Sequence, residues 1–216
     1  MQVDAITVSI NFGDYLETTL PRNRKVFRHM LVVTAKDDVH TMDVCIRNGV
    51  RYITTNDHCR GNDVFNKGKA INAGLQLLTR NAWMCHLDAD CVVTTELRRC
   101  LRDEYLKRNT IYGCHRLLCH APGHYRKWEL NRCPVHLGQD LRLPGQAPAG
   151  FFQLWHGEQQ HLYPENHPSA TKSDLDFARL FPRRRILPAF VVHICSEKKN
   201  EENRDHLGRV SPEWTP

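Results

Sequence analysis

Long apolar runs are missing from this sequence. No window approaches 18 consecutive apolar residues, the length that a helix needs to cross a bilayer. The first residues, MQVDAITVSINFG, lack the basic segment followed by a long apolar segment that marks a secretory leader. We therefore expect neither a membrane span nor a signal peptide, and we expect a cytoplasmic protein.

An even set of cysteines is missing as well. The nine cysteines are an odd number, and Cys85, Cys91 and Cys195 lie in apolar segments that are typical of strands. Secreted domains usually carry a paired disulfide framework, whereas reducing compartments keep thiols free. The cysteine pattern therefore favours free thiols and a reducing, cytoplasmic setting.

Neither sign of charge dominates strongly. The chain of 216 residues carries 30 Lys and Arg against 24 Asp and Glu, a formal net charge of +6. A mild positive excess suits an anionic ligand, such as a nucleotide, a phosphosugar or a nucleic acid, and does not choose among them. The hydrophobic content of 41% is enough for one sizeable core.

Strand and helix patterns alternate in the first half of the sequence. Strands are expected at 5–10, 29–35, 50–55 and 82–88, with a helical pattern after each. The helix after the second strand is expected to end at Gly49. This alternation predicts an α/β fold in a single domain, with a mainly parallel, doubly wound sheet.

The second half is less regular. Strands are expected at 110–118, 150–157 and 186–194, and a short helix at 173–181. The stretch from 119 to 148 is rich in Gly, Pro and His and shows no period, so no helix or strand is expected there. A charged tail follows the last strand and is expected to be loosely held.

The expected strand at 82–88 ends in two carboxylates one residue apart, Asp88 and Asp90. Burial of an isolated charge is costly, so the pair is expected at a sheet edge, facing a cation or a ligand. Open α/β sheets bind ligands beyond the carboxyl ends of their strands. Mg²⁺ and Mn²⁺ prefer such oxygen ligands and share their shell with substrate phosphates. A solvated pair that caps the next helix is the alternative.

A basic helix start precedes this strand. Asn66, Lys67, Gly68 and Lys69 lie where a loop enters a helix, so backbone N–H groups and two ammonium groups can meet an anion there. The order of VSINFGDYL, NKGKAINAGL and HLDAD resembles the inverting glycosyltransferases of the GT-A fold, in particular family 2. The resemblance covers most of the chain, and its D-x-D motif falls at the end of the expected strand.

This resemblance implies a reaction and its cofactor. The enzyme would move a sugar from a nucleotide-diphosphate sugar, with a UDP-sugar favoured, to an acceptor hydroxyl, with Mn²⁺ or Mg²⁺ as cofactor. The acceptor is open among a glycan, a protein and a modified nucleic acid. Residues 1–95 would form the nucleotide-sugar-binding half of a single catalytic domain, residues 96–195 the acceptor and catalytic half, and residues 196–216 a C-terminal tail.

The resemblance also implies donor-side roles for residues that follow the strands. Ser9 and Asn11 resemble the family's nucleotide-contacting turn, Asp37 or Asp38 the acid that contacts the base, and Asp57 is a further candidate for the base pocket. The remaining donor-side residues are Asn66, Lys67 and Lys69 near the diphosphate, Asp88 at the ribose or sugar, and Arg209 in the tail.

On the acceptor side, Phe151 and Trp155 in PAGFFQLWHG resemble the rings that stack on a sugar face, and core packing is the alternative for both. The segment ATKSDLDFARLF resembles the helix that carries the catalytic base. The family usually has Glu-Asp there, whereas this chain has Ser173-Asp174. Asp174 is therefore the predicted base, and Asp176 is the second choice.

The predicted metal ligands are Asp90, Asp88 and His193. His193 ends the last expected strand and matches the family's third metal-side position. A neutral imidazole beside a carboxylate suits a divalent cation.

Two other functions compete with this prediction. Cys114, Cys119, Cys133 and His136 could close a structural zinc site in a basic nucleic-acid-binding protein. A sugar-phosphate nucleotidylyltransferase would need a Gly-rich basic loop after the first strand. The sequence there, NFGDYLETTLP, has one glycine and two acids, which argues against that enzyme.

Overall fold

The computed structural model describes residues 2–56, 59–60, 64–102, 106–131, 137–143, 145–165, 167 and 170–194. Its strands are β1 Val3–Val8, β2 His29–Ala35, β3 Arg51–Thr55, β4 Cys59–Arg60, β5 Val64–Phe65, β6 Trp83–Leu87, β7 Cys91–Val93, β8 Thr110–Cys119, β9 Gly138–Asp140, β10 Phe152–His156 and β11 Arg183–Ile194. Its helices are α1 Gly13–Asn23, α2 Val39–Arg47, α3 Lys67–Leu75, α4 Thr95–Cys100, α5 Pro122–Asn131 and α6 Ala170–Arg179. Among these helices, none is long and apolar enough to cross a membrane.

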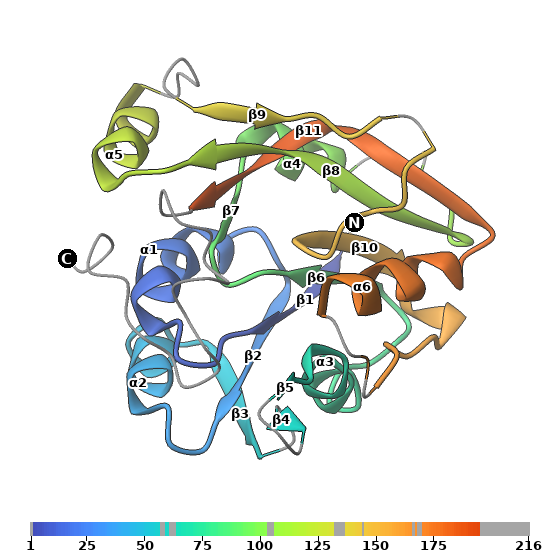
Figure 1. Ribbon diagram of the computed structural model, residues 1–216, viewed down its shortest axis with the longest axis horizontal. Helices are drawn as coiled ribbons and strands as arrows, with labels where there is room; N and C mark the ends of the chain where they lie inside the picture. Colours follow the sequence, from blue (N-terminus) through green and yellow to red (C-terminus); the bar gives the residue numbers. More distant parts are fainter. Residues whose placement is uncertain are drawn as a thin grey trace.

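A mixed sheet of nine strands organises most of the described residues, and β4 and β5 pair separately (Figure 1). Its strand order is β3-β2-β1-β6-β10-β8-β11-β7, and β9 pairs with β8. The strands β3, β2, β1 and β6 run parallel, as do β8 and β11, whereas β10 runs antiparallel between β6 and β8. The predicted α/β fold with a largely parallel sheet is confirmed, and β10 joins its two parallel parts.

Helices cover both faces of the sheet, as the alternation of side chains on β1 requires. Val3 and Ala5 pack in the core cluster that includes residues of α1 and α2. Ile6 and Val8 pack in the cluster that includes residues of α3 and α6. Because successive side chains of a strand point to opposite faces, both sets are buried and the sheet is doubly wound.

Local sequence signals fix where the helices begin and end. Asp38, Asn66 and Thr94 are the N-caps of α2, α3 and α4, and the side chain of each accepts a hydrogen bond from a backbone N–H of the first turn. Gly49 has φ of 62°, so the predicted end of α2 is confirmed.

The expectation of no regular structure from 119 to 148 is wrong over α5 and β9. Tyr125 and Trp128 lie three residues apart on α5, and both are buried in a cluster with residues of β8 and β11. Two aromatic residues at this spacing cover one face of a helix. The burial of Tyr125 and Trp128 therefore stabilises α5. The other residues of this helix are mostly polar or charged, so the sequence shows no clear helical period.

Candidate active site

The two carboxylates of the D-x-D motif lie in the turn between β6 and β7. The Asp88 N–H donates to the carbonyl of Phe151 at 3.1 Å, and the Ile194 N–H donates to the carbonyl of Asp90 at 2.8 Å. From α1, the Thr19 hydroxyl donates to the carbonyl of Ala89 at 2.7 Å. Three separate elements therefore hold the backbone of this turn, which fixes the directions of both carboxylates.

A buried lysine joins two carboxylates at this turn. Lys67, the first residue of α3, has its Nζ 2.8 Å from Asp88 Oδ1 and 3.0 Å from Asp174 Oδ2 on α6. The other oxygen of Asp174, Oδ1, is buried and has no hydrogen-bond partner among the described residues. The site thus contains a buried carboxylate oxygen that no described protein group satisfies.

Burial and charge set the protonation of this cluster. Burial raises the pKa of Asp174 to about 6, although Lys67 opposes the shift. Burial opposes the charge of Lys67, but Asp174 and Asp88 outweigh it and raise the lysine's pKa. Burial also raises the pKa of Asp88 against the effect of Lys67. A carboxylate with a pKa near 6 is suited to accept a proton near neutral pH.

His86 lies beneath the cluster in β6 and was not identified from the sequence. Its side chain is fully buried, and its Nε2 lies 3.5 Å from Asp88 Oδ1. Burial first and Lys67 second hold the pKa of His86 well below its usual value, so the imidazole is neutral. The sequence signal for His86 was a histidine inside an apolar strand. A buried imidazole needs polar neighbours, so such a residue indicates a polar site nearby.

A glycine makes room for Asp174. A Cβ built on Gly150 would lie 1.6 Å from Asp174 Oδ2 and 2.7 Å from Asp174 Cβ. Non-bonded atoms do not approach so closely, so any side chain at position 150 must displace Asp174 or the segment that holds it.

We therefore expect Gly150→Ala to lower the turnover rate at least tenfold and to cost about 1–3 kcal/mol of unfolding free energy, the usual cost of overpacking. Gly123→Ala is the matched control, because a Cβ at this exposed position of α5 meets nothing within 4 Å. That control should keep its activity and gain slightly in stability, since alanine is the better helix former. Full activity of Gly150→Ala in a steady-state assay would contradict the role of this glycine.

Asp90 and His193 form a second cluster next to the first. His193 Nε2 lies 3.1 Å from Asp90 Oδ2. Burial lowers the pKa of His193, but Asp90 outweighs burial and raises it. Asp90, Cys91 and His193 offer potential ligand atoms within 4.8 Å of one another.

This group of atoms fits a divalent cation. A carboxylate and an imidazole suit Mn²⁺ or Mg²⁺, with the remaining positions left for water or phosphate oxygens. Burial raises the pKa of the Cys91 thiol well above its usual value, and hard cations such as Mn²⁺ and Mg²⁺ prefer oxygen ligands to a thiol. Asp90 and His193 are thus the residues that would hold the ion.

The turn after β1 is tied to the start of α2. The Asn11 N–H and the Thr34 hydroxyl both donate to Asp38 Oδ2, at 2.6 and 2.9 Å. The Ser9 hydroxyl lies 3.3 Å from the Thr41 hydroxyl. Asp38 is therefore buried as a cap and a brace for this turn, whereas Asp37 is exposed.

Other donor-side candidates lie at the start of α3 or outside the described residues. Asn66 is buried, and its Oδ1 accepts from the Lys69 N–H at 3.3 Å. The side chain of Lys69 is partly buried beside this cap. Asp57 and Arg209 lie outside the described residues.

The two candidates on the acceptor side, Phe151 and Trp155, need correction. Trp155 is fully buried and packs edge-on against Phe177 at 5.0 Å, so it has no face for a sugar. Phe151 is 5% exposed, and the guanidiniums of Arg116 and Arg142 lie over its ring. Because helices or strands cover both faces of β10, alternation sends neither set of its side chains to solvent.

Asp176 points away from the lysine cluster. Its carboxylate is 3.1 Å from His167 Nε2 and 2.5 Å from Arg179 Nη1. Two positions apart on a helix, side chains lie on different faces. The structure thus brings Asp174, and not Asp176, to Lys67 and Asp88.

The predicted zinc site does not form as a set. Cys114 and Cys119 are five residues apart on β8, so they point to opposite faces, and they lie in different core clusters. These two thiols cannot bind one ion together. Cys133 and His136 lie outside the described residues.

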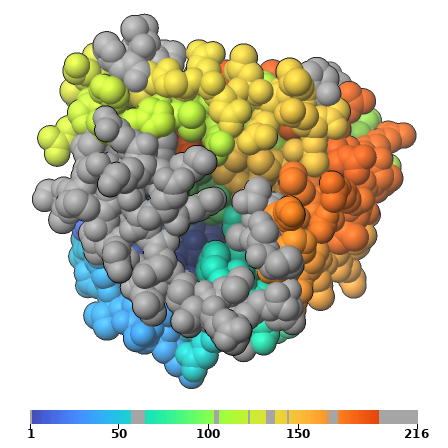
Figure 2. All heavy atoms as spheres, viewed as in Figure 1, coloured from blue at the N-terminus to red at the C-terminus, as the bar shows by residue number. Residues whose placement is uncertain are grey.

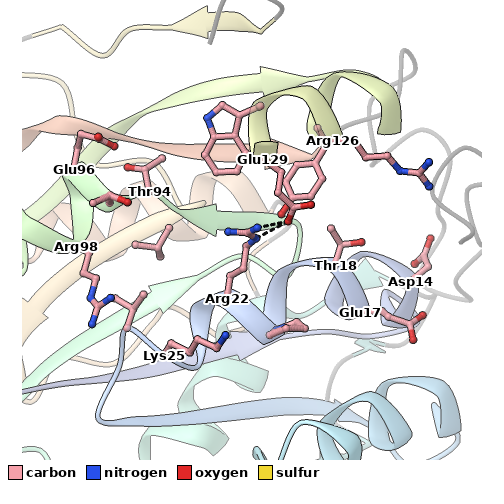
Figure 3. A pocket seen from close by; sticks show the side chains of 16 residues that line it. Asp14, Glu17, Thr18, Arg22, Lys25, Thr94, Glu96, Arg98, Arg126 and Glu129 are labelled. Atoms are coloured by element: carbon pink, nitrogen blue, oxygen red, sulfur yellow. Dashed lines mark hydrogen bonds and ion pairs between the residues drawn. The ribbon is translucent and has the colours of Figure 1, made fainter. Parts of the chain in front are cut away.

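The surface of the molecule has a hollow on the face drawn in Figure 2 and a groove elsewhere. The face in Figure 2 is hollowed near its middle, where dark blue atoms of the N-terminal region and teal atoms of the α3 region are visible. A separate groove of about 710 Å³ lies between α1, α5 and the start of α4, and an Arg22–Glu129 ion pair crosses it (Figure 3). The described lining of this groove includes neither Lys67 nor Asp174, so it is distinct from the cluster above.

Comparisons by sequence find no match: no protein-family model and no curated protein matches the chain. Comparisons by structure do. Glucosyl-3-phosphoglycerate synthase from Mycobacterium tuberculosis, in complex with Mn²⁺, UDP-glucose and phosphoglyceric acid, is 11% identical with a TM-score of 0.56, over 93% of this chain and 74% of that one.

Two other solved structures show the same similarity. The galactosyltransferase LgtC in complex with donor and acceptor sugar analogues is 13% identical with a TM-score of 0.54, over 91% of this chain and 88% of that one. A protein assigned as a glucose-1-phosphate thymidylyltransferase, from Bacillus anthracis, is 10% identical with a TM-score of 0.52, over 89% of both chains. The chain thus has the fold of the GT-A nucleotide-sugar transferases.

Proposed function

We propose that this chain is a metal-dependent glycosyltransferase that moves a sugar from a UDP-sugar to an acceptor hydroxyl with inversion, as family 2 enzymes do. The observation that carries the proposal is the Asp174–Lys67–Asp88 cluster. It combines a buried carboxylate whose pKa is about 6 with a fixed cation, at the turn that holds the D-x-D motif. A general base and a polar donor site are what sugar transfer to a hydroxyl requires.

The first half of the chain is proposed to bind the donor. The turn with Ser9 and Asn11 meets Asp38 where β1 and β2 end, and the basic start of α3 lies beyond β3. Backbone N–H groups at that helix start favour an anion such as a diphosphate. The similar structures with UDP or UDP-glucose and Mn²⁺ or Mg²⁺ support a donor of this class.

Asp174 is proposed as the base. In its deprotonated form it takes the proton from an acceptor hydroxyl, whose oxygen then bonds to the anomeric carbon as the bond from that carbon to the diphosphate breaks. Lys67 keeps the carboxylate oriented through Oδ2, which leaves Oδ1 available for the acceptor. Asp90 and His193 would hold the divalent ion, which when bound would offset charge on the leaving diphosphate.

The similarity to a thymidylyltransferase raises a second candidate function, because the fold alone does not separate the two reactions. The turn after β1 discriminates between them. A nucleotidylyltransferase needs a Gly-rich basic loop there to hold a triphosphate, whereas this turn has Asn11 and is braced by the Asp38 carboxylate. The nucleophile of that reaction is a sugar phosphate that is already ionised, so it would not need a buried carboxylate such as Asp174 as a base. Both points favour sugar transfer.

A binding screen tests the proposed function. UDP, GDP, ADP and dTDP are titrated by calorimetry into the wild type and Asp90→Ala, with and without Mn²⁺. We expect one nucleotide to bind in a Mn²⁺-dependent manner, and we expect Asp90→Ala to lose the part of the affinity that depends on Mn²⁺.

Asp43→Ala is the matched control, because this acid is exposed and pairs with Arg47 on α2. It should bind as the wild type does. If no nucleotide diphosphate binds to the wild type under any condition, the glycosyltransferase proposal fails.

A further inference from the structure

Two arginines share one carboxylate beside the candidate metal site. Arg116 on β8 donates from Nε to Asp140 Oδ2 at 2.6 Å, and Arg142 Nη2 lies 3.3 Å from the same oxygen. Each guanidinium also lies over the ring of Phe151, at 5.1 and 5.5 Å from its centre. Two cations that share one acid leave an excess positive charge, held in place by stacking.

This arginine pair is connected to the active-site residues. Arg116 Nη1 lies 3.4 Å from His193 Nδ1, and His193 Nε2 lies 3.1 Å from Asp90. The carbonyl of Phe151 accepts from the Asp88 N–H at 3.1 Å. The positive charge is therefore adjacent to the D-x-D turn.

The pair also lies on one particular side of that turn. In the sheet, β6 separates β1 and β2 from β10 and β8. The turns proposed to bind the nucleotide follow β1 and β2, whereas Arg116 and Arg142 belong to β8 and to the segment after β9. An anion held by the arginines would therefore approach from the side opposite the nucleotide.

A purely structural role explains only part of this arrangement. In the β8–β9 pairing Arg116 lies opposite Asp140, and one arginine is enough to attach β9 to β8. Arg142 adds a second cation, and its buried Nε has no hydrogen-bond partner among the described residues. A buried donor without a partner costs free energy unless a ligand satisfies it. The planar guanidinium fork matches a phosphate or a carboxylate.

We propose that Arg116 and Arg142 bind a phosphate or carboxylate group of the acceptor. This assignment rests on the proposed glycosyltransferase function and narrows its acceptor to small hydroxylated molecules that carry an acidic group. The donor diphosphate is the other source of the same chemistry, and the experiment below separates the two.

Inorganic phosphate is the probe. Its binding to the wild type, Arg116→Gln, Arg142→Gln and the control Arg108→Gln is measured by calorimetry, with and without saturating UDP and Mn²⁺. Arg108→Gln removes the same positive charge as the two pair variants do, but from an exposed arginine that pairs with Glu158. We expect Arg116→Gln and Arg142→Gln each to bind phosphate at least about tenfold more weakly than the wild type. Arg108→Gln should bind phosphate with the affinity of the wild type. We also expect phosphate to bind when UDP and Mn²⁺ are already bound.

Two results overturn the assignment. Equal phosphate affinity in all four proteins excludes the arginine pair as the site. Exclusion of phosphate by UDP with Mn²⁺ assigns the pair to the donor diphosphate. Should either variant fail to fold, the arginine Nε–H signals of the wild type are followed by NMR during the titration, and signals that do not move refute the proposal.

This result is independent of the test of the proposed function. Phosphate binding requires no sugar transfer and no nucleotide. If no nucleotide diphosphate binds but phosphate binds through Arg116 and Arg142, the glycosyltransferase proposal fails and the anion site remains.

Discussion

Asparagine in place of Asp174 is expected to lower kcat by a factor of about 10²–10⁴, with little change in the affinity for the nucleotide and Mn²⁺. Asparagine keeps the shape that fits against Gly150, and its carbonyl oxygen can still accept a hydrogen bond from Lys67. It cannot take up a proton from an acceptor. The loss should therefore appear in the chemical step and not in donor binding.

The pH profile provides a second readout of the same substitution. Burial raises the pKa of Asp174 to about 6, and the base must be deprotonated to act. The ratio kcat/KM of the wild type should therefore fall about tenfold per pH unit as the pH drops below about 6. Asp174→Asn should show a low rate without this limb. An unchanged acid limb in the variant would assign the ionisation to another group.

Asp176→Asn separates the two candidate bases. This carboxylate pairs with His167 and Arg179 and does not contact Lys67. Its loss should change the rate by far less than the loss of Asp174. A larger effect at Asp176, or a collapse of nucleotide binding in Asp174→Asn, would contradict the assignment of the base.

Much of the first half of the chain could be predicted because its signals are local. The strands β1, β2 and β3 follow one another along the chain with a helix after each of the first two, and each pairs in parallel with the next, as short right-handed connections favour. The D-x-D pair follows a buried strand. Because burial of a charged carboxylate is costly, the pair is expected at an edge of the sheet. Lys67 is the first residue of a capped helix, and this position predicts that it lies near an anion. The sequence does not predict which carboxylates it contacts.

The second half of the chain depends on contacts between distant segments. β10 is inserted antiparallel between β6 and β8, and no local pattern specifies that neighbour. Burial on both of its faces places Trp155 in the core, whereas the family resemblance implied that its ring stacks on a sugar. Gly150 against Asp174 is likewise a long-range contact, and any loop glycine looks the same in sequence.

The sequence contains only a weak signal for the pair of Arg116 and Arg142. Arg116 interrupts the otherwise apolar strand TIYGCHRLLC, and a charge in such a strand indicates a partner nearby. The partner, Asp140, lies in the stretch whose lack of period concealed α5 and β9. The charge could be noticed from sequence, but its pairing could not.

Lys67→Met is expected to destabilise the protein by about 3–5 kcal/mol near pH 8, because it leaves the Asp88 and Asp174 carboxylates without their shared cation. Methionine occupies a similar volume, so the loss reports the charge and not a cavity. The same variant should have almost no transfer activity near pH 7, since without Lys67 the pKa of Asp174 rises further and the base is protonated.

The loss of stability should depend on pH in a defined direction. Lys67 lowers the pKa of Asp174, so in the variant the folded state holds its proton to a still higher pH, whereas the unfolded chain releases it near 3.8. The folded variant binds more protons than the unfolded chain between these values, and its stability therefore falls as the pH rises through this window. Urea unfolding at about pH 5 and about pH 8 should give the smaller loss at the lower pH.

Lys36→Met, at an exposed position, is the control and should change stability by less than about 0.5 kcal/mol at both pH values. An equal loss for Lys67→Met at the two pH values would mean that the ionisation of Asp174 does not contribute to the loss. The cluster would then lack the electrostatic coupling on which the role of Asp174 as a base depends, and the pH profile of transfer would have to originate elsewhere.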